Sequence, residues 1–145
     1  MTYIDFVLLT ERKVAFYTSL TNRGHVGFSE TDMLLKFNQV YTNIGDAYNP
    51  STGFFTAPVR GVYYFQFTLC GVMAETMGVM VYKNNKKIMR NEEYKRWSGH
   101  QYLTNSVVLE LMAGDEISLV LPSDFLLYDD GDNNTTFSGS LLFTL

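Results

Sequence analysis

The side chains that could perform chemistry are few and scattered along the chain. The two histidines, His25 and His100, lie far apart, and Cys70 is the one cysteine. Neither histidine has a Ser or Cys nucleophile motif beside it, and the sequence contains no Gly-x-Ser-x-Gly, no phosphate-binding loop and no Cys/His metal cluster. Because a function must be argued from a site, and no catalytic site is visible, we predict that the chain is not an enzyme.

Cys70 follows the apolar run from Tyr63 to Leu69. No neighbouring base is visible to activate it, so we predict a buried structural thiol rather than a nucleophile. A lone cysteine forms no disulfide within its own chain, which leaves an interchain disulfide open. His25 lies in Arg23-Gly24-His25-Val26-Gly27, which we interpret as a loop, and His100 is expected in a second, solvated loop.

The acidic run Asp129-Asp130-Gly131-Asp132-Asn133 could bind a cation. It lacks the D-x-D-x-D-G spacing and the terminal Glu of an EF-hand. We interpret it as an acidic surface loop, and ligand capture through calcium at Asp129, Asp130 and Asp132 stays open. The same loop contains overlapping N-glycosylation sequons at Asn133 and Asn134, of which one would be used in a secreted chain.

Six cations gather in a short window with only Glu92 and Glu93 among them: Lys83, Lys86, Lys87, Arg90, Lys95 and Arg96. One interpretation is a solvated edge hairpin, since Lys discourages edge-to-edge pairing. The other is a patch for an acidic partner at Lys86, Lys87 and Arg90. The net charge of −4 argues against nucleic acid as a partner. The apolar runs fall short of the ~20 residues that a membrane span needs, so no membrane insertion is predicted.

The elements that position these residues are predicted to be strands. The chain has ten Tyr and eleven Phe, which suit pleated surfaces. Apolar or alternating runs, separated by turn signals, predict strands at 14–20, 62–69, 78–82, 87–90, 106–111, 117–121 and 137–143. No amphipathic helix of ten or more residues is found. We predict one all-β domain, a sandwich or barrel.

The last strand is apolar up to Leu145, which predicts a central strand and favours a closed jelly roll over a meander. The stretches 43–53 and 123–136 are rich in Gly, Asn and Asp and are predicted to be surface loops.

The ordered series Phe37, Asn43, Tyr48, Phe55, Gly61, Tyr63, Phe65 and Phe67 resembles the signature of the C1q domain. Further segments agree with that family: Thr52-Gly53-Phe54-Phe55-Thr56-Ala57-Pro58, Leu109-Glu110-Leu111 with Gly114-Asp115, and Phe137-Ser138-Gly139 with Leu141-Leu142. The resemblance covers residues 13–145, with 1–12 as a lead-in segment. Within the family, the residue pattern is most similar to that of the short C1q-like and cerebellin-like proteins of vertebrates, especially those of fish.

The resemblance implies a ten-strand jelly roll that assembles as a homotrimer, with Tyr63, Phe65 and Phe143 near the threefold axis. It also implies calcium near the trimer apex, at Glu93, the carbonyl of Tyr94, and Gln101. Relatives often carry an acid where this chain has the neutral Gln101, so solvated polar loop residues are the alternative.

The function that the resemblance implies is a secreted, trimeric ligand-binding module, foremost for innate-immune recognition of microbial or other extracellular ligands. The alternatives are a signalling ligand for a receptor ectodomain, of the cerebellin-like or tumour-necrosis-factor-like type, and the trimerising end of a collagen-like matrix protein. Trimerisation would turn a weak contact into an avid one.

Overall fold

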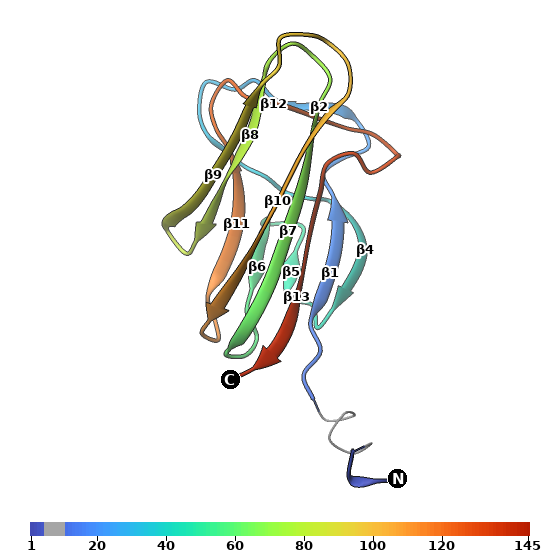
Figure 1. The fold of residues 1–145 in the computed structure, drawn as a ribbon, viewed down its shortest axis with the longest axis vertical. Coiled ribbons are helices and arrows are strands. Elements are labelled where there is room, and N and C mark those ends of the chain that lie inside the picture. The colour runs from blue at the N-terminus through green and yellow to red at the C-terminus, as the bar shows by residue number, and fades with distance from the viewer. Residues whose placement is uncertain (5–10) are drawn as a thin grey trace.

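The computed structural model describes residues 1–4 and 11–145, and the strands of the described part form a β-sandwich (Figure 1). The strands are β1 (Ala15–Ser19), β2 (Gly24–Gly27), β3 (Met33–Leu34), β4 (Gln39–Ile44), β5 (Tyr48–Asn49), β6 (Phe54–Thr56), β7 (Gly61–Gly71), β8 (Thr76–Lys83), β9 (Lys86–Tyr94), β10 (Gln101–Leu111), β11 (Glu116–Leu121), β12 (Leu126–Asp129) and β13 (Thr136–Thr144). The all-β jelly roll is thus confirmed, with two-residue strands such as β3 and β5 raising the number of strands above ten.

One layer is a five-stranded antiparallel sheet in the order β10-β7-β13-β1-β4. The C-terminal strand β13 lies at its centre, between β7 and β1, as its apolar sequence predicts. The registers Phe137↔Phe67 and Gly139↔Phe65 align the aromatic positions of neighbouring strands. Because side chains alternate along a strand, this register also fixes which residues face away from the core.

The second layer is a six-stranded sheet in the order β5-β6-β11-β8-β9, with β3 paired to β11. Its edge is the β8–β9 hairpin, which turns at Asn84 and Asn85, as the polar sequence there predicts. Asn84 adopts a φ of 55°, a left-handed conformation that Asn tolerates better than most residues. A small third sheet pairs β12 with β2 above the sandwich (Figure 1).

The core between the two layers is built from stacked and edge-on aromatic rings. Phe16 lies 5.2 Å from Tyr48 and 5.0 Å from Phe137 between ring centroids, and Phe55 lies 4.9 Å from Phe65. Such pairs contribute about 0.5–1.5 kcal/mol each beyond the burial of their area. Cys70 is buried as predicted, and burial raises the pKa of its thiol, which keeps it protonated and unreactive.

Three segments differ from the sequence predictions. His25 lies in β2 and not in a loop, since β2 pairs with β12 in the register Tyr128↔His25. The strand β12 itself falls inside the stretch 123–136, which we expected to be irregular throughout. β4 and β5 likewise enter the stretch 43–53. β2, β5 and β12 have four residues or fewer, too few to show a period, and β4 enters the stretch with its last two residues alone.

Gly139 of the final strand is required by close packing. A Cβ there would lie 2.7 Å from Phe65 Cδ1 and 2.8 Å from Phe16 Cε1, both rings of the closed core. Because these rings are held by further aromatic neighbours, they have little room to move away.

We therefore expect Gly139→Ala to lower the free energy of unfolding by about 1–3 kcal/mol through overpacking. Urea denaturation measures this change. Gly131→Ala is the matched control, since nothing lies within 4 Å of a Cβ at Gly131. Equal stability of the two variants would show that the core accommodates the extra methyl group.

Candidate functional site

The face of the five-stranded sheet that points away from the core is open in the single chain. We call it the open face and define it by seven residues of its strands: Tyr17, Tyr41, Tyr64, Tyr102, Val108, Leu142 and Phe143. Along β7, odd-numbered residues from Gly61 to Leu69 are buried and even-numbered ones are half-buried. On neighbouring strands the open face is more exposed, with Val108 at 55% and Phe143 at 50%.

The open face changes character along its length. Near the C-terminal end it is apolar, with Val108, Leu142 and Phe143 exposed. Further along the strands, Ser138, Gln66 and Ser106 stand in one cross-strand row, followed by the hydroxyls of Thr68 and Thr104, 2.8 Å apart. Two tyrosines tie the face to the loop before β13, since Tyr41 Oη donates to Asn133 Oδ1 and Tyr102 Oη to Asn134 Oδ1.

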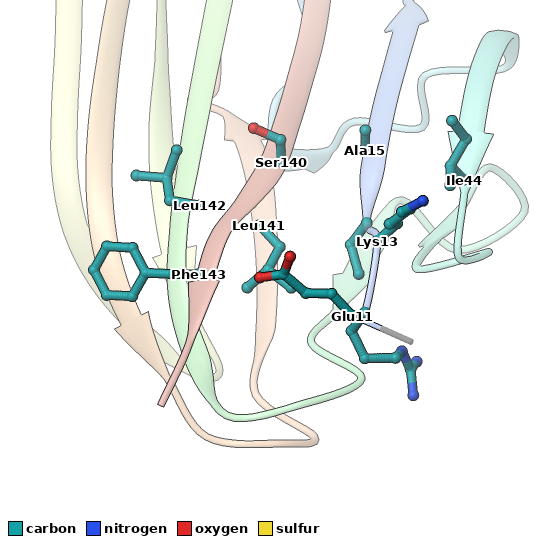
Figure 2. Close-up of a pocket in the computed structure, with 10 residues that line it drawn as sticks. Glu11, Lys13, Ala15, Ile44, Ser140, Leu141, Leu142 and Phe143 are labelled. Atoms are coloured by element: carbon teal, nitrogen blue, oxygen red, sulfur yellow. The ribbon is translucent and has the colours of Figure 1, made fainter. Parts of the chain in front are cut away.

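A hollow of about 340 Å³ lies at the apolar end of the open face (Figure 2). It is lined by the incoming segment from Glu11 to Ala15, by Ile44 and by the outgoing segment from Ser140 to Phe143. A bulge in the pairing of β13 with β7 between Leu141 and Phe143 leaves Leu142 and Phe143 both exposed. The concave surface combines exposed apolar side chains with charges at its rim.

The assignment of Tyr63 and Phe65 to a chain–chain interface is corrected by their burial. Both rings lie inside the core of one chain, and Tyr63 Oη donates to the carbonyl of Val59 at 2.7 Å. Because side chains alternate along a strand, a neighbouring chain could contact only the even-numbered side of β7, and a place for β7 at an interface stays a prediction. Phe143 is exposed, so its assignment stays a prediction.

The acidic loop is organised by Asp129, which is buried and not available to a ligand. Its Oδ2 accepts the backbone N–H groups of Leu20 and Thr21, at 2.9 and 3.2 Å. Its Oδ1 accepts those of Asp130 and Asn134, at 2.8 and 2.7 Å. One carboxylate therefore fixes the loop to the end of β1, which corrects its assignment to a ligand-binding loop.

Asp130 lies at the centre of a second polar cluster. Its carboxylate accepts the backbone N–H of Asp132 and the hydroxyl of Tyr128, which hold the pKa of that carboxyl below its ordinary value. His25 and His100 both pack edge-on against the Tyr128 ring, at 5.1 and 5.7 Å between centroids. The structure thus brings together both histidines, although the sequence gives no sign of it. Asp132 is exposed and keeps its assignment to a ligand-binding loop as a prediction.

The basic residues of the β8–β9 hairpin have different surroundings. Lys86 and Lys87 are exposed at the sheet edge. Arg90 is used within the chain, since its guanidinium lies 5.5 Å from the Phe125 ring centroid and 3.5 Å from Glu92 Oε2. An acidic partner at Lys86, Lys87 and Arg90 stays a prediction, with Arg90 already paired.

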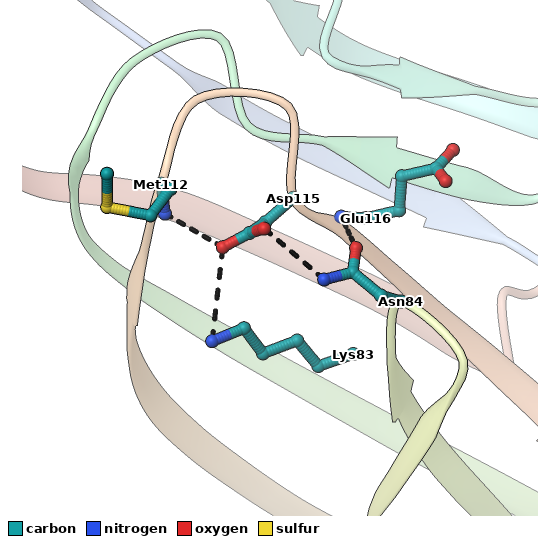
Figure 3. Close-up of polar contacts among 5 residues, drawn as sticks. All are labelled: Lys83, Asn84, Met112, Asp115 and Glu116. Carbon is teal, nitrogen blue, oxygen red and sulfur yellow. Dashed lines mark hydrogen bonds and ion pairs between the residues drawn. The ribbon is translucent and has the colours of Figure 1, made fainter.

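The Gly114-Asp115 turn is explained by its hydrogen bonds (Figure 3). Asp115 accepts the backbone N–H of Met112 at 2.8 Å and the amide of Asn84 at 3.3 Å, and Lys83 Nζ lies 3.9 Å away. Asn84 Oδ1 in turn accepts the N–H of Glu116. The turn therefore joins β10–β11 to the β8–β9 hairpin, and the Met112 hydrogen bond is the first reason that the pKa of Asp115 is lowered.

The residues predicted for calcium lie at one end of the sandwich. Glu93 and Tyr94 end β9, and Gln101 begins β10. Calcium takes six to eight oxygen ligands and prefers carboxylates. Glu93 is the one carboxylate of the three, and the described residues contain no cluster of three or more His, Cys, Asp or Glu able to hold a metal. The donor set of one chain does not fit calcium by itself, and calcium here stays a prediction.

Lys95, between these strands, is a residue whose role the sequence does not show. The sequence places Lys95 among six cations of a solvated hairpin, but in the structure the residue is 3% exposed. Its ammonium donates to the carbonyls of Trp97 and Gly99, at 2.9 and 2.8 Å. Lys is almost never fully buried unless paired, so the composition of the loop gave no signal for it.

The geometry defines a class of protein: an all-β jelly-roll module built from two packed antiparallel sheets. No helix of the described part is long and apolar enough to cross a membrane. Comparison with known proteins gives the family. The C1q domain matches residues 15–142, and the chain belongs to the C1q domain family.

Curated relatives and solved structures agree with this family. Human complement C1q and tumor necrosis factor-related protein 9A is 33% identical over 91% of this chain, and human complement C1q tumor necrosis factor-related protein 3 is 33% identical over 92%. The chain spans only 39% and 52% of their lengths.

The globular domain of zebrafish complement 1qA superposes with a TM-score of 0.71 at 20% identity, covering 91% of this chain and 99% of that one. Murine APRIL superposes with a TM-score of 0.69 at 14% identity, covering 90% and 100%. At these identities the structures show a shared fold.

Replacement of the buried Asp129 should destabilise the domain. In Asp129→Asn, one side-chain oxygen becomes an N–H₂ donor that faces backbone donors, and leaving such groups unsatisfied costs about 2–4 kcal/mol. Thermal and urea unfolding measure the change. Asp132→Asn removes the same charge from an exposed position of the same loop and should be neutral. Equal midpoints for the two variants would contradict the role of Asp129.

The lowered pKa of Asp115 predicts a pH-dependent contribution to stability. The ionised carboxylate is favoured in the folded state, so its contribution is present above the ordinary value of 3.8. The contribution is lost as the pH falls below that value and through the folded-state pKa. The melting temperature of Asp115→Asn should therefore lie below that of the wild type at pH 6, and the difference should shrink toward pH 3. A difference independent of pH would contradict this origin.

Proposed function

We propose that this chain is a C1q-type module that assembles as a homotrimer through its open face and binds extracellular ligands with its loops. The observation that carries the proposal is the composition of β7 and its neighbours. Tyr63, Phe65 and Phe67 fill the core, yet Tyr64 stands on the opposite face beside Val108. At the end of this face near the C-terminus, Val108, Leu142 and Phe143 are exposed, and the single chain leaves these apolar side chains uncovered. Exposed apolar surface of this extent marks an interaction site.

A second copy of the same chain is the occupant that fits this surface. The outward-facing residues of β7 and β13, in the interior of the five-stranded sheet, carry no charge, and the cores of interfaces between subunits are likewise depleted of charged residues. A rotational assembly brings one part of the surface against a different part of the neighbour, so protruding and hollow regions can pair. The hollow lined by β13, Ile44 and the segment before β1 provides the recess, and Val108, exposed on the edge strand β10, lies on a different part of the surface.

Assembly would strengthen ligand recognition by the exposed loops. Three equivalent weak contacts on one body bind a multivalent target far more tightly than one contact does. We propose secretion and extracellular recognition, foremost of microbial or immune ligands, because the family signature points to complement-type heads. The fold shared with murine APRIL and with Eiger TNF from S. frugiperda, at a TM-score of 0.67 for the latter, supports receptor binding as the second candidate. The trimerising end of a collagen-like matrix protein is the third class.

The candidates differ in what they bind. A pattern-recognition module binds lipopolysaccharide, glycans or whole bacteria, whereas a receptor ligand binds one protein saturably and ignores bacteria. Binding of the purified chain to intact bacteria, measured by sedimentation, separates them. Saturable binding to cells without any binding to bacteria would favour the receptor ligand.

Assembly is tested by a charge placed on the open face. Wild-type protein should have the mass of three chains by light scattering, and Val108→Lys should shift it to one chain, because a buried, unpaired ammonium opposes association. Ile88→Lys introduces the same residue at a partly exposed position of the other sheet and should remain trimeric. A monomeric wild type would overturn the proposal.

The same measurement in EDTA tests calcium. A mass unchanged by EDTA means that the apolar interface holds the assembly without metal. A trimer that dissociates in EDTA would assign a structural ion to Glu93, Tyr94 and Gln101 of the assembled chains.

Secretion places a glycan on the loop before β13, and the structure favours Asn133 over Asn134. The amide Nδ2 of Asn134 donates to Asp130 Oδ1 at 2.7 Å, whereas the hydrogen bond of the Asn133 side chain uses its oxygen. We expect expression in a secretory host to add one glycan, lost in Asn133→Gln and kept in Asn134→Gln. Mass spectrometry after enzymatic deglycosylation reads the site directly, and a glycan on Asn134 would contradict the expectation.

A further inference from the structure

The end of the sandwich opposite the C-terminus is a tip made of two loops, which lie together in Figure 1 above β8 and β10. The loop from 72 to 75 joins β7 to β8, and the loop from 95 to 100 joins β9 to β10. Backbone hydrogen bonds link them, from Gly99 N to Val72 O at 2.7 Å and from Lys95 N to Glu75 O at 3.3 Å.

Lys95 makes the tip rigid from inside. Its ammonium donates to the carbonyls of Trp97 and Gly99, and its stem packs against Gly71, where a Cβ would lie 2.8 Å from Lys95 Cδ. The ion pairs of the described residues do not include Lys95. A buried ammonium is costly, and its hydrogen bonds here serve to fix the loop. The buried ammonium thus fixes the backbone of this loop at Trp97 and at Gly99.

The fixed loop exposes aromatic surface. Trp97 is the one tryptophan of the chain and is 79% exposed. Tyr94, at the end of β9, and Met73, in the neighbouring loop, are also exposed, as is Arg96. These side chains belong neither to the core nor to the open face. A large, uncovered indole on a loop whose backbone is fixed by hydrogen bonds indicates a contact surface.

We propose that this tip binds the interfacial layer of a phospholipid bilayer, with Trp97, Tyr94 and Met73 at headgroup depth. Trp and Tyr favour that layer because their rings are amphipathic, and Arg96 can pair with lipid phosphate. This is adsorption on the surface and differs from spanning the membrane, for which the chain has no predicted segment.

Symmetry selects a lipid surface over a single protein pocket, and this step rests on the proposed trimer. Copies related by a rotation axis hold equivalent atoms at one height along the axis. Figure 1 places the tip at the end of the sandwich away from the C-terminus. In a trimer whose axis runs along the strands of the open face, the three tips would therefore lie in one plane. A flat bilayer meets three coplanar tips at once, and each adds to the binding of the others. The net charge of −4 gives no general attraction to anionic lipid, so apolar contact dominates and salt has little effect.

The single tryptophan makes a direct test. Phosphatidylcholine vesicles are titrated into the trimeric protein at low and high salt, and Trp97 emission is recorded together with co-sedimentation. The expected result is a shift of the emission maximum to shorter wavelength and at least a tenfold loss of vesicle affinity in Trp97→Ala. Lys95→Met should weaken binding by loosening the loop. Met112→Ala, which removes an exposed apolar side chain next to the end of β10 that lies away from the tip, should bind as the wild type does.

Two results would overturn the proposal: unchanged Trp97 emission with vesicles, or co-sedimentation of Trp97→Ala equal to that of the wild type. Either result would leave insertion of the indole into a pocket of a partner protein as the alternative. Light scattering on the same samples separates this failure from that of the assembly. A trimer without vesicle binding overturns the lipid surface alone. A monomer that still shows the emission shift supports the tip and overturns the trimer.

Discussion

The structure depends on one constraint: the five-stranded sheet has two faces, and a single chain covers only one of them, leaving apolar side chains exposed at one end of the other. The odd-numbered residues of β7 complete an aromatic core with Phe16, Phe55 and Phe137. Its even-numbered residues, with Val108 and Phe143 of the neighbouring strands, remain open to solvent. Burial of one large apolar side chain contributes about 1.5–3 kcal/mol to stability. Covering the apolar end of the open face would therefore add hydrophobic stabilisation that the single chain lacks. The core accounts for the fold, and the uncovered face is the observation from which we propose assembly.

The loops at the end of the sandwich are shaped by buried polar groups instead. Asp129 gathers four backbone N–H groups and fixes the loop before β13 to β1. Lys95 gathers two carbonyls and fixes the loop between β9 and β10. Each group satisfies backbone atoms that would otherwise lack partners, and so holds a loop that lies outside the sheets. Rigid loops suit recognition, because less conformational entropy is lost when a ligand binds.

The fold could be predicted from sequence to a large extent, because its information is local and periodic. The aromatic run at Tyr63, the Asn84-Asn85 turn and the apolar C-terminus each specify an element, and the family signature orders them. The assignment of Tyr63 and Phe65 to a surface between chains is wrong, because the alternation of β7 turns both rings into the core. The roles of Asp129 and Lys95 could not be predicted, since charged residues in polar stretches look solvated until the backbone around them is known. The convergence of His25 and His100 on Tyr128 depends on tertiary pairing across the chain.

The central claim is that the open face is covered in solution while the tip is not. Hydroxyl-radical footprinting with mass spectrometry measures the solvent exposure of individual aromatic side chains in the intact protein. The account predicts that Tyr41, Tyr102 and Phe143, all exposed in the single chain, are oxidised slowly, while Trp97 and the exposed Phe28 are oxidised rapidly. Oxidation of Phe143 and Tyr102 at rates expected from the single chain would show that the open face stays in water, and would contradict the account.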